Sequence, residues 1–402
     1  MDAAVGSLAK VSSPGRPPLW LASAATAAAW GALYSVGRWV FGFVTFPIHE
    51  DARINYVAAQ AGLRFGWSRI YDFTTLRQLS QVFPAAERSI DATATYISPP
   101  LLAWLFVPLT LVPEPVAYLI WTLGALAALV WTWHVSAPYD GLAKLTLLLA
   151  ALALWPVMQV FYYGQPGVVV VALVALAWWL IRAERPISGG VALAFATALK
   201  PQVVILVPLA LLAAGRIKPV VGWVAAGLLL AVLSAANIGI DGISSYWQAL
   251  KLVQDDTGHA YFTIAQVFGL GPLTYVLLAI QGIACLAVAR IRRHDLETVF
   301  AVGLLGSLMV AFHLHQWDYT NLVLGAWLVL RNSPPLWHRV FLAAGVVTMQ
   351  LLSIGVAIPQ LAWDVVWLGI LAAGATARSK VATAASEPRT SPLRTPQGRA
   401  SG

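Results

Sequence analysis

Charge is what this sequence has least of. Only 10% of its 402 residues are Asp, Glu, Lys or Arg, whereas 59% are hydrophobic. Soluble proteins average about 25% charged and about 45–50% apolar residues. A water-soluble fold could not bury this much apolar surface, but a chain in lipid needs polar residues mainly in its loops. The composition therefore predicts an all-α, polytopic integral membrane protein.

Cysteine is scarce and the common nucleotide-binding and hydrolase motifs are missing. The single cysteine, Cys285, stands in an apolar run, which excludes a disulfide within the chain and disfavours thiolate metal chemistry. The sequence contains no P-loop, no GxSxG, no HExxH and no GxGxxG before a helix. Its net charge of +8 comes from basic residues in short loops and tails, as the positive-inside rule describes, so we expect no nucleic-acid partner.

Long apolar runs follow one another along most of the chain. A helix needs about 20 apolar residues to cross a bilayer. A shorter stretch, 99–112, could cross, re-enter or lie at the surface. With both termini expected in the cytoplasm, the runs predict about twelve crossings, with a range of roughly 10–13. The candidate spans are 19–45, 115–136, 142–162, 166–182, 187–214, 218–238, 267–289, 296–312, 317–331, 337–357 and 361–377.

Polar segments divide the rest of the chain. Residues 1–18 are expected to form a cytoplasmic tail and 19–377 the transmembrane domain, because the first apolar run is too long for a cleavable signal peptide. Within that domain, 47–98 predicts a first extracytoplasmic loop carrying short surface helices, and 239–266 predicts a second outer loop. Residues 378–402 are rich in Ser, Thr, Pro and Arg, which predicts a disordered cytoplasmic tail.

The topology of the central region depends on one possible break. Pro201 removes a helix hydrogen bond and disfavours helical conformation at Lys200. If 99–112 crosses and 187–214 is one helix, Arg182 and Arg185 fall outside the cytoplasm. If 99–112 does not cross and 187–214 breaks at Lys200-Pro201 into two short spans, they fall inside. We prefer the broken arrangement, although half-spans of about 14 residues barely reach across a hydrocarbon core of about 30 Å.

The first candidate site follows the first span. His49, Glu50 and Asp51, with Arg53 close behind, would lie at the outer membrane surface. Ionisable side chains grouped at that depth indicate function, and a carboxylate there can act as a general base toward a hydroxyl group. The alternative is that Asp51 simply caps the N-terminus of the helix that follows.

The second candidate site lies late in the chain. His313, His315 and Asp318 follow a span that starts after a cluster of cytoplasmic arginines, so they share the outer side with Asp51. Two histidines and an aspartate at this spacing could bind a metal, act as acid and base, or bind hydroxyl groups. The alternative is an interfacial turn in the aromatic belt.

Two further polar positions interrupt apolar stretches. Lys200 would cost several kcal/mol at mid-bilayer unless it is paired or hydrated. In the broken topology it emerges at the outer surface, where it could hold a lipid-linked phosphate; the alternative is a snorkelling lysine. Gln165, between Gly164 and Pro166, also faces outward in that topology, and its alternative is a plain helix–helix turn.

The order of these motifs resembles that of a known family. After the acidic Asp51 region come Ser98-Pro99-Pro100-Leu101, then Gly164-Gln165, then Lys200-Pro201, and finally His313-Leu314-His315 with Trp317-Asp318-Tyr319. Over about residues 15–377 the chain resembles the GT-C glycosyltransferases of family 87, which include polyprenyl-phosphate-mannose-dependent mannosyltransferases. One departure is Ala311-Phe312, where the family has a small residue or Ser-Pro before the late histidines, and it puts the role of His313 in doubt.

The resemblance implies a GT-C-like fold with its active site on the extracytoplasmic face of the plasma membrane. It implies Asp51 as the catalytic carboxylate, with His315 and Asp318 as further catalytic candidates. No cofactor is required if Lys and Arg side chains neutralise the donor phosphate, while a divalent metal stays open. The substrate-binding residues it implies, read together with the local motifs, are His49, Glu50, Arg53, Tyr56, Gln165, Lys200 and His313.

The expected function is therefore transfer of a hexose such as mannose, with inversion, from a polyprenyl-phosphate donor to an envelope lipid or glycan. The partners implied are the lipid-linked donor, this acceptor and membrane lipids. Two rivals share the apolar spans: a transporter or flippase for lipid-linked sugars, and a non-catalytic scaffold of an envelope-synthesis complex. The sequence shows no internal repeat, which counts against a transporter built from inverted halves.

Overall fold

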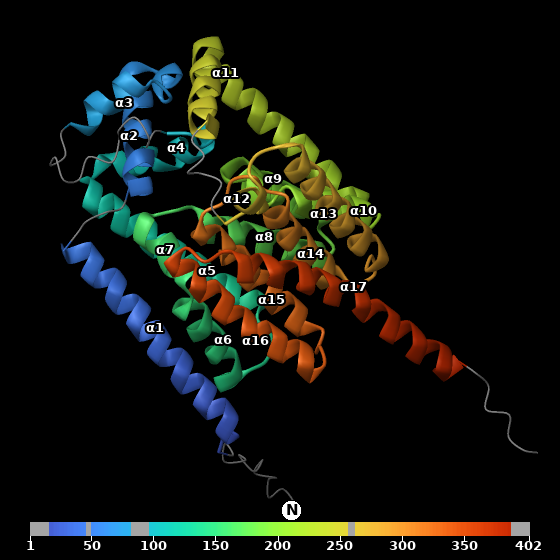
Figure 1. Ribbon diagram of the computed structural model, residues 1–402. Coiled ribbons are helices and arrows are strands. Elements are labelled where there is room, and N and C mark those ends of the chain that lie inside the picture. The colour runs from blue at the N-terminus through green and yellow to red at the C-terminus, as the bar shows by residue number, and fades with distance from the viewer. Residues whose placement is uncertain (1–15, 46–49, 82–95, 256–261, 387–402) are drawn as a thin grey trace, which may run out of the picture.

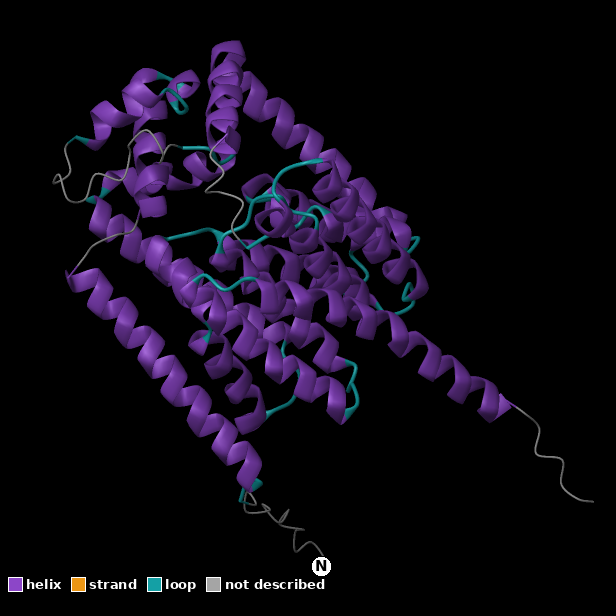
Figure 2. Ribbon diagram, viewed as in Figure 1, coloured by secondary structure: helices purple, strands orange, loops and turns teal. Residues whose placement is uncertain are grey.

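The computed structural model describes residues 16–45, 50–81, 96–255 and 262–386, so His49 lies outside the described residues. Within these ranges every regular element is a helix and no strand occurs (Figure 2). The all-α prediction is confirmed.

Seventeen α-helices and several 3₁₀ turns make up the described chain (Figure 1). The α-helices are α1 (Leu19–Thr45), α2 (Glu50–Phe65), α3 (Phe73–Ser80), α4 (Pro100–Phe106), α5 (Glu114–Ser136), α6 (Gly141–Ala153), α7 (Trp155–Tyr163), α8 (Gly167–Arg182), α9 (Pro186–Leu199), α10 (Leu206–Ala213), α11 (Ile217–Asp255), α12 (Ile264–Phe268), α13 (Pro272–Ile291), α14 (Leu296–Met309), α15 (Asn321–Arg331), α16 (Leu336–Leu351) and α17 (Ile358–Ser386). The 3₁₀ turns used below are η1 (Trp67–Arg69), η3 (Val107–Leu111), η4 (Pro201–Val203) and η6 (Gln316–Thr320).

The helices long and apolar enough to cross a membrane are fewer than the sequence suggested. Among the described residues, 5 helices qualify, in α1, α5, α11, α13 and α16, and a sixth if α6 and α7, bent by 61°, form one span. The other apolar helices are shorter, including α8, α9 and α14. The chain is multi-pass, but the expected count of about twelve crossings is not confirmed.

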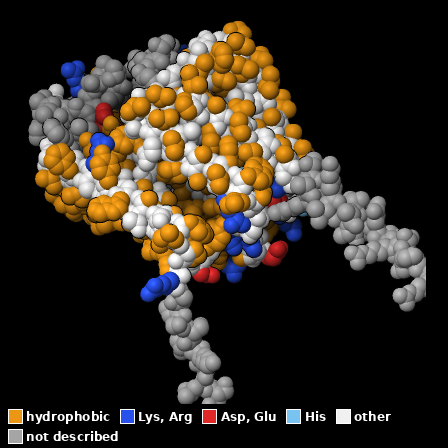
Figure 3. All heavy atoms as spheres, turned by 60° about the horizontal axis from the view of Figure 1, so that its bottom comes forward, with side chains coloured by type: hydrophobic (Ala, Val, Ile, Leu, Met, Phe, Trp, Pro, Cys, Tyr) orange, Lys and Arg blue, Asp and Glu red, His pale blue; other side chains and the backbone are white. Residues whose placement is uncertain are grey.

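The apolar stretch 187–214 is broken where Pro201 predicted. Helix α9 ends at Leu199, η4 follows, and α10 starts at Leu206. Arg182 forms an ion pair with Glu297, and the guanidinium groups of Arg182 and Arg331 lie 5.3 and 5.0 Å from the Trp178 ring. Arg182 and Arg331 therefore share one end of the bundle, as in the broken arrangement. Figure 3 shows charged side chains gathered on that side of the molecule, between broad hydrophobic surfaces.

Two segments are more helical than expected. Helix α11 continues past residue 238 through a kink at Gly239, whose φ of 66° suits glycine, and reaches Asp255. The described residues 239–255 and 264–266 of this segment are therefore helical. Helix α17 likewise continues past residue 377 to Ser386, into the segment expected to be disordered. In both places low hydropathy ended the predicted span, although the backbone continues as a helix.

The described residues of the segment 47–98 include the short helices α2 and α3. Helices α2 and α3 group with α4 and the far half of α11 at the upper end of Figure 1. Tyr71 joins these pieces, since its ring lies 5.4 Å from that of Tyr96 and 4.7 Å from that of Tyr246. Its hydroxyl also donates a hydrogen bond to the Ser98 carbonyl at 2.9 Å. This small cluster fixes α2 over the end of the bundle.

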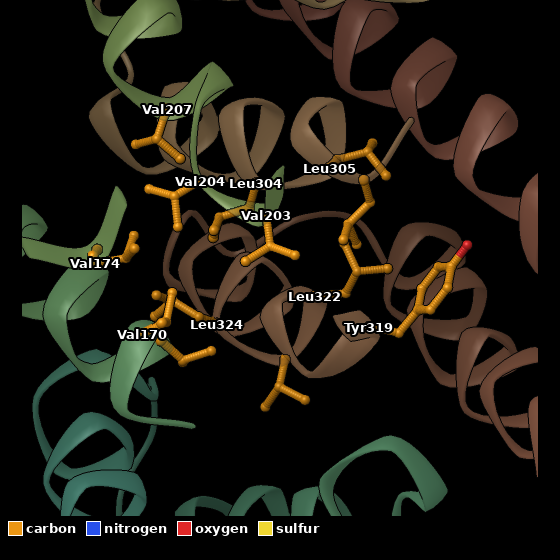
Figure 4. Close-up of a cluster of buried hydrophobic side chains, with 14 of the residues drawn as sticks. Val170, Val174, Val203, Val204, Val207, Leu304, Leu305, Tyr319, Leu322 and Leu324 are labelled. Atoms are coloured by element: carbon orange, nitrogen blue, oxygen red, sulfur yellow. The ribbon is translucent and has the colours of Figure 1, made fainter. Parts of the chain in front are cut away.

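A dense apolar cluster adjoins two of the candidate site residues, Lys200 and Asp318. Figure 4 shows valines of α8, η4 and α10 packed against leucines of α14 and α15, with Tyr319 at one side. Val203 lies three residues after Lys200, and Tyr319 directly follows Asp318; both are buried. In lipid such packing is driven by close van der Waals contact, which makes the backbone under these side chains rigid.

Helices α9 and α11 approach each other through glycines. A side chain at Gly190 would overlap the Pro219 carbonyl oxygen, and one at Gly222 would overlap that of Ile187. Small residues at membrane helix contacts allow this close backbone approach. The contact holds α9, whose C-terminus carries Lys200, against the long helix α11.

We expect Gly190→Ala to destabilise the protein by about 1–3 kcal/mol, because the added methyl group forces α9 away from α11. Thermal unfolding of the detergent-solubilised protein measures the effect. Gly227→Ala on α11 is the matched control, since a methyl group there meets nothing within 4 Å. Equal stability of the two variants would show that the close approach is unimportant.

Candidate active site

Four polar side chains from four separate segments meet in one line of contacts, the four-residue network. Gln165 Nε2 donates to Asp51 Oδ2 at 2.5 Å. Lys200 Nζ donates to Gln165 Oε1 at 3.1 Å. The same ammonium lies 2.5 Å from Asp318 Oδ1. Residues 51, 165, 200 and 318, which the sequence singled out separately, are therefore brought together.

The turn between α7 and α8 places Gln165 against Asp51. Gly164 ends α7 with φ 71° and ψ 33°, a left-handed conformation that glycine adopts without strain. A Cβ atom on Gly164 would lie 2.5 Å from that of Ala52, so α2 can pack on this turn only at a glycine. Trp121 Nε1 donates to the Gly164 carbonyl at 2.9 Å and holds the turn from α5.

The helix break at Pro201 places Lys200 in the network. Lys200 directly follows the last residue of α9 and has φ −153° and ψ 82°, outside the helical range, so the helix does not continue through it. Lys200 is 8% exposed and Asp318 3% exposed. A charge that is this buried needs a partner, because removal from water costs several kcal/mol. The ion pair between the two residues supplies it.

The late histidine motif lies beside the network at Asp318. Asp318 Oδ2 accepts a hydrogen bond from the His315 backbone N–H at 2.9 Å, which fixes the start of η6. The His315 ring stacks on Trp317 with centroids 4.4 Å apart, and the His313 ring meets it edge-on at 4.9 Å. The structure thus ties His315 to the network through its backbone, and its ring belongs to an aromatic group.

Burial, above all, raises the pKa of the Asp51 carboxyl from 3.8 to about 7. The hydrogen bond from Gln165 and the charge of Lys200 favour the carboxylate, while the negative charges of Glu50 and Asp318 disfavour it. A carboxyl group with a pKa near 7 is suited to general-base chemistry at neutral pH.

Other expected site residues lie beside the network or turn away from it. Arg53 is buried and pairs with Glu114 at 3.5 Å, in the contact between α2 and α5. The Tyr56 hydroxyl donates to the Val112 carbonyl at 2.9 Å, also on the far side of α2. The structure therefore does not bring Arg53 or Tyr56 into the network, whereas Glu50 lies next to Asp51 at the start of α2.

Two aromatic residues of the site were not among the expected site residues: Tyr163, which was not singled out from the sequence, and Trp317, which was named only as part of the late motif. The Tyr163 ring lies 4.9 Å from that of Trp317, and Tyr163 also interacts electrostatically with Glu50 and Asp51. Tyr163 and Trp317 thus link the α7 turn to η6. The signal available was their position directly beside Gly164-Gln165 and Asp318.

Two other features bear on what the site can bind. Among the described side chains no three His, Cys, Asp or Glu residues come together as a metal site, the two late histidines included. An apolar cavity of about 220 Å³ lies between α12, α13, α14 and α17, with Asp364 in its wall. None of the network residues lines that cavity. The network itself offers a carboxylate, an amide and an ammonium group.

Comparison with known proteins identifies the family. The family described as Glycosyltransferase family 87 matches residues 96–313, more than half of the chain. The chain belongs to glycosyltransferase family 87. The resemblance seen in the sequence motifs is thereby confirmed. Of the network, Gln165 and Lys200 lie inside the matched range of the family 87 chain, while Asp51 precedes it and Asp318 follows it.

One curated relative gives a more specific likeness. Over 123 residues the family 87 chain is 34% identical to the polyprenol-phosphate-mannose-dependent alpha-(1-2)-phosphatidylinositol pentamannoside mannosyltransferase of Mycolicibacterium smegmatis. The match covers 28% of this chain and 30% of the relative, so the chain spans less than a third of the relative's length in this match. No solved structure matches the chain.

We expect Gly164→Ala to lower the activity of the family 87 chain at least tenfold, because the methyl group pushes α2 and Asp51 away from Gln165. Sugar transfer by the purified variant measures this. Gly141→Ala is the control: Gly141 also has a positive φ, 55°, but a methyl group there meets nothing within 4 Å. If both variants lose activity equally, strain in the backbone and not the contact with Ala52 is responsible.

Proposed function

We propose that this family 87 protein is a membrane glycosyltransferase that moves a hexose, with mannose as the first candidate, from a polyprenyl phosphate to a lipid or glycan acceptor. The observation that carries the proposal is the contact of Asp51, Gln165 and Lys200, which sets a carboxylate and an ammonium group on either side of one amide. The relative named above supports the choice of donor, since its name specifies polyprenol-phosphate-mannose.

The carboxylate and the ammonium group supply the two functions that the transfer needs. The acceptor hydroxyl oxygen attacks the anomeric carbon of the donor sugar while Asp51 removes the hydroxyl proton. The bond between that carbon and the phosphate oxygen breaks, and polyprenyl phosphate leaves with the electron pair. A single displacement of this kind inverts the configuration at the anomeric carbon. General-base help of this kind is worth about 10²–10⁴-fold in rate.

Lys200 is suited to stabilise the leaving phosphate. Within the described residues its ammonium group uses one N–H for Gln165 and one for Asp318, and an ammonium group has three. The third can point at a phosphate oxygen, where negative charge grows as the sugar leaves. The rings of His313 and His315, which contact each other before Asp318, would bind sugar hydroxyl groups in this proposal.

The basic residues indicate which side of the membrane the site faces. Arg182 and Arg331 lie together at one end of α8 and α15, while Gln165 and Asp318 lie at the opposite ends of the same helices. Since loops rich in Arg and Lys stay in the cytoplasm, the network would face the extracytoplasmic side of the cell membrane. A sugar carried on a lipid is available there without a nucleotide.

We expect Asp51→Asn to lower transfer by at least 10²-fold while the protein still inserts and folds, because the amide cannot accept the proton. The assay uses purified protein, radiolabelled polyprenyl-phosphate-mannose and a phosphatidylinositol mannoside as acceptor. Asp72→Asn is the control: Asp72 lies on the same polar segment and caps α3, a role that Asn also fills. Translocation of the labelled donor across vesicles without transfer to any acceptor would instead identify a flippase.

The proposal also predicts a pH profile. Asp51 must be ionised to accept a proton, and its pKa is raised to about 7. We therefore expect kcat/KM to be highest above pH 7 and to fall about tenfold per pH unit well below it, as the carboxylate becomes protonated. A profile of kcat/KM from pH 5 to 9 measures this, and a flat profile down to pH 5 would exclude Asp51 as the base.

A further inference from the structure

The Asp318 carboxylate is connected to Asp51 through Lys200 and Gln165. Both of its oxygen atoms have a fixed partner. Its Oδ2 atom is held by the His315 backbone N–H at 2.9 Å, and its Oδ1 atom lies 2.5 Å from Lys200 Nζ. Asp318 is therefore fixed by its own backbone turn and in turn fixes the ammonium group. Both side chains are almost fully buried, so the pair is not loosened by solvent.

The ammonium group of Lys200 decides which way the Gln165 amide points. An ammonium group only donates hydrogen bonds, so the Gln165 atom that faces it at 3.1 Å must be the carbonyl oxygen, Oε1. The other end of the amide, Nε2, then has to face Asp51, where it donates at 2.5 Å. Without Lys200 in place the amide could rotate by half a turn and present its oxygen to Asp51. That oxygen can be satisfied only if Asp51 is protonated, which would leave it unable to act as a base.

From this chain of contacts we propose that Asp318 is a positioning residue: it holds Lys200, Lys200 locks the orientation of the Gln165 amide, and the amide keeps Asp51 aligned as a proton acceptor. The proposal rests on the proposed function for its catalytic meaning, since it assumes that Asp51 is the base. It assigns Asp318 a role through other residues and removes it from the groups that touch the sugar. The same ammonium group then serves both the base and the leaving phosphate.

The charges that act on Asp51 include those of Lys200, which favours the carboxylate, and of Asp318 and Glu50, which disfavour it. Glu50 precedes it on α2, and Tyr163 on α7 is a near neighbour. Arg53, on the same helix, is paired with Glu114 of α5. The hydrogen bond from Gln165 is the largest contribution that favours the carboxylate. If Lys200 no longer orients the Gln165 amide, this hydrogen bond is lost. Asp51 should then be harder to ionise, and its titration should move to higher pH.

The test follows the titration of Asp51 directly. Infrared spectra of the reconstituted full-length protein are recorded from pH 5 to 10, and the carboxylic-acid C=O band of Asp51 is identified by its loss in Asp51→Asn. In Asp318→Asn we expect its midpoint to rise by about one pH unit, which is about a tenfold fall in the acid dissociation constant. Loss of the Asp318 negative charge alone would lower the midpoint, so a rise reports the misplaced Gln165 amide. Asp318→Glu keeps the negative charge, but its side chain is one methylene longer and displaces the Lys200 ammonium group. This variant should raise the midpoint as well, and it serves if Asp318→Asn does not fold.

Asp364→Asn is the matched control, because Asp364 is as buried as Asp318 but bonds to Gln360 on α17 and lies outside the network. The Asp51 midpoint should stay at its original pH in this variant. An unchanged or lowered Asp51 midpoint in Asp318→Asn, or an unchanged one in Asp318→Glu, would overturn the proposal.

Transfer assays separate this inference from the proposed function. In Asp318→Asn we expect kcat to fall about fivefold at pH 7 and to recover by about pH 9, where Asp51 is again ionised. A structural defect would lower kcat equally at all pH values, and that result would overturn the inference. If the protein transfers no sugar at all, the proposed function fails, while the infrared titration still decides whether Asp318 acts on Asp51.

Discussion

The buried ion pair between Lys200 and Asp318 is the contact on which the site depends. A lysine at this depth is stable only with a partner, and Asp318 comes from a segment 118 residues later in the chain. The pair joins the end of α9 to the turn before α15 and so closes the bundle around the site. Because Lys200 also contacts Gln165, the same pair fixes the position of the turn before α8.

A broken helix in a membrane leaves backbone groups that water cannot satisfy, and this protein satisfies them with side chains. Asn321 Nδ2 donates to the Val203 carbonyl at 2.9 Å, and Leu206 N–H donates to Ser307 Oγ at 3.0 Å. The first bond ties the break to α15 and the second ties the start of α10 to α14. Irregular backbone at membrane depth is tolerated where it is buried in protein in this way. The break therefore costs little, and it delivers a charged side chain to the site.

The fold class and the helix break at Pro201 could be predicted from the sequence, whereas several contacts between helices could not. Composition and apolar runs indicated the class, and Pro201 indicated the break, because both depend on local chemistry. From the sequence, Asp51, Gln165, Lys200 and Asp318 could be placed only on the same side of the membrane. Their contacts with one another come from the structure. The pairing of Arg53 with Glu114 depends on how α2 turns over α5, which hydropathy does not encode. The number of crossings is not confirmed, since helices such as α8 are apolar yet shorter than a full crossing.

The short helices also explain why a lipid-linked donor suits the site. Helix α8 has 16 residues between Gly167, two residues after Gln165, and Arg182 at the basic end. At 1.5 Å per residue it spans about 24 Å, less than the hydrocarbon core of about 30 Å. If Arg182 stays at the cytoplasmic interface, the network lies a few ångströms inside the opposite one. A nucleotide sugar would have to leave water to reach that depth, whereas a sugar phosphate on a polyprenyl chain is already held at the membrane surface by its own tail.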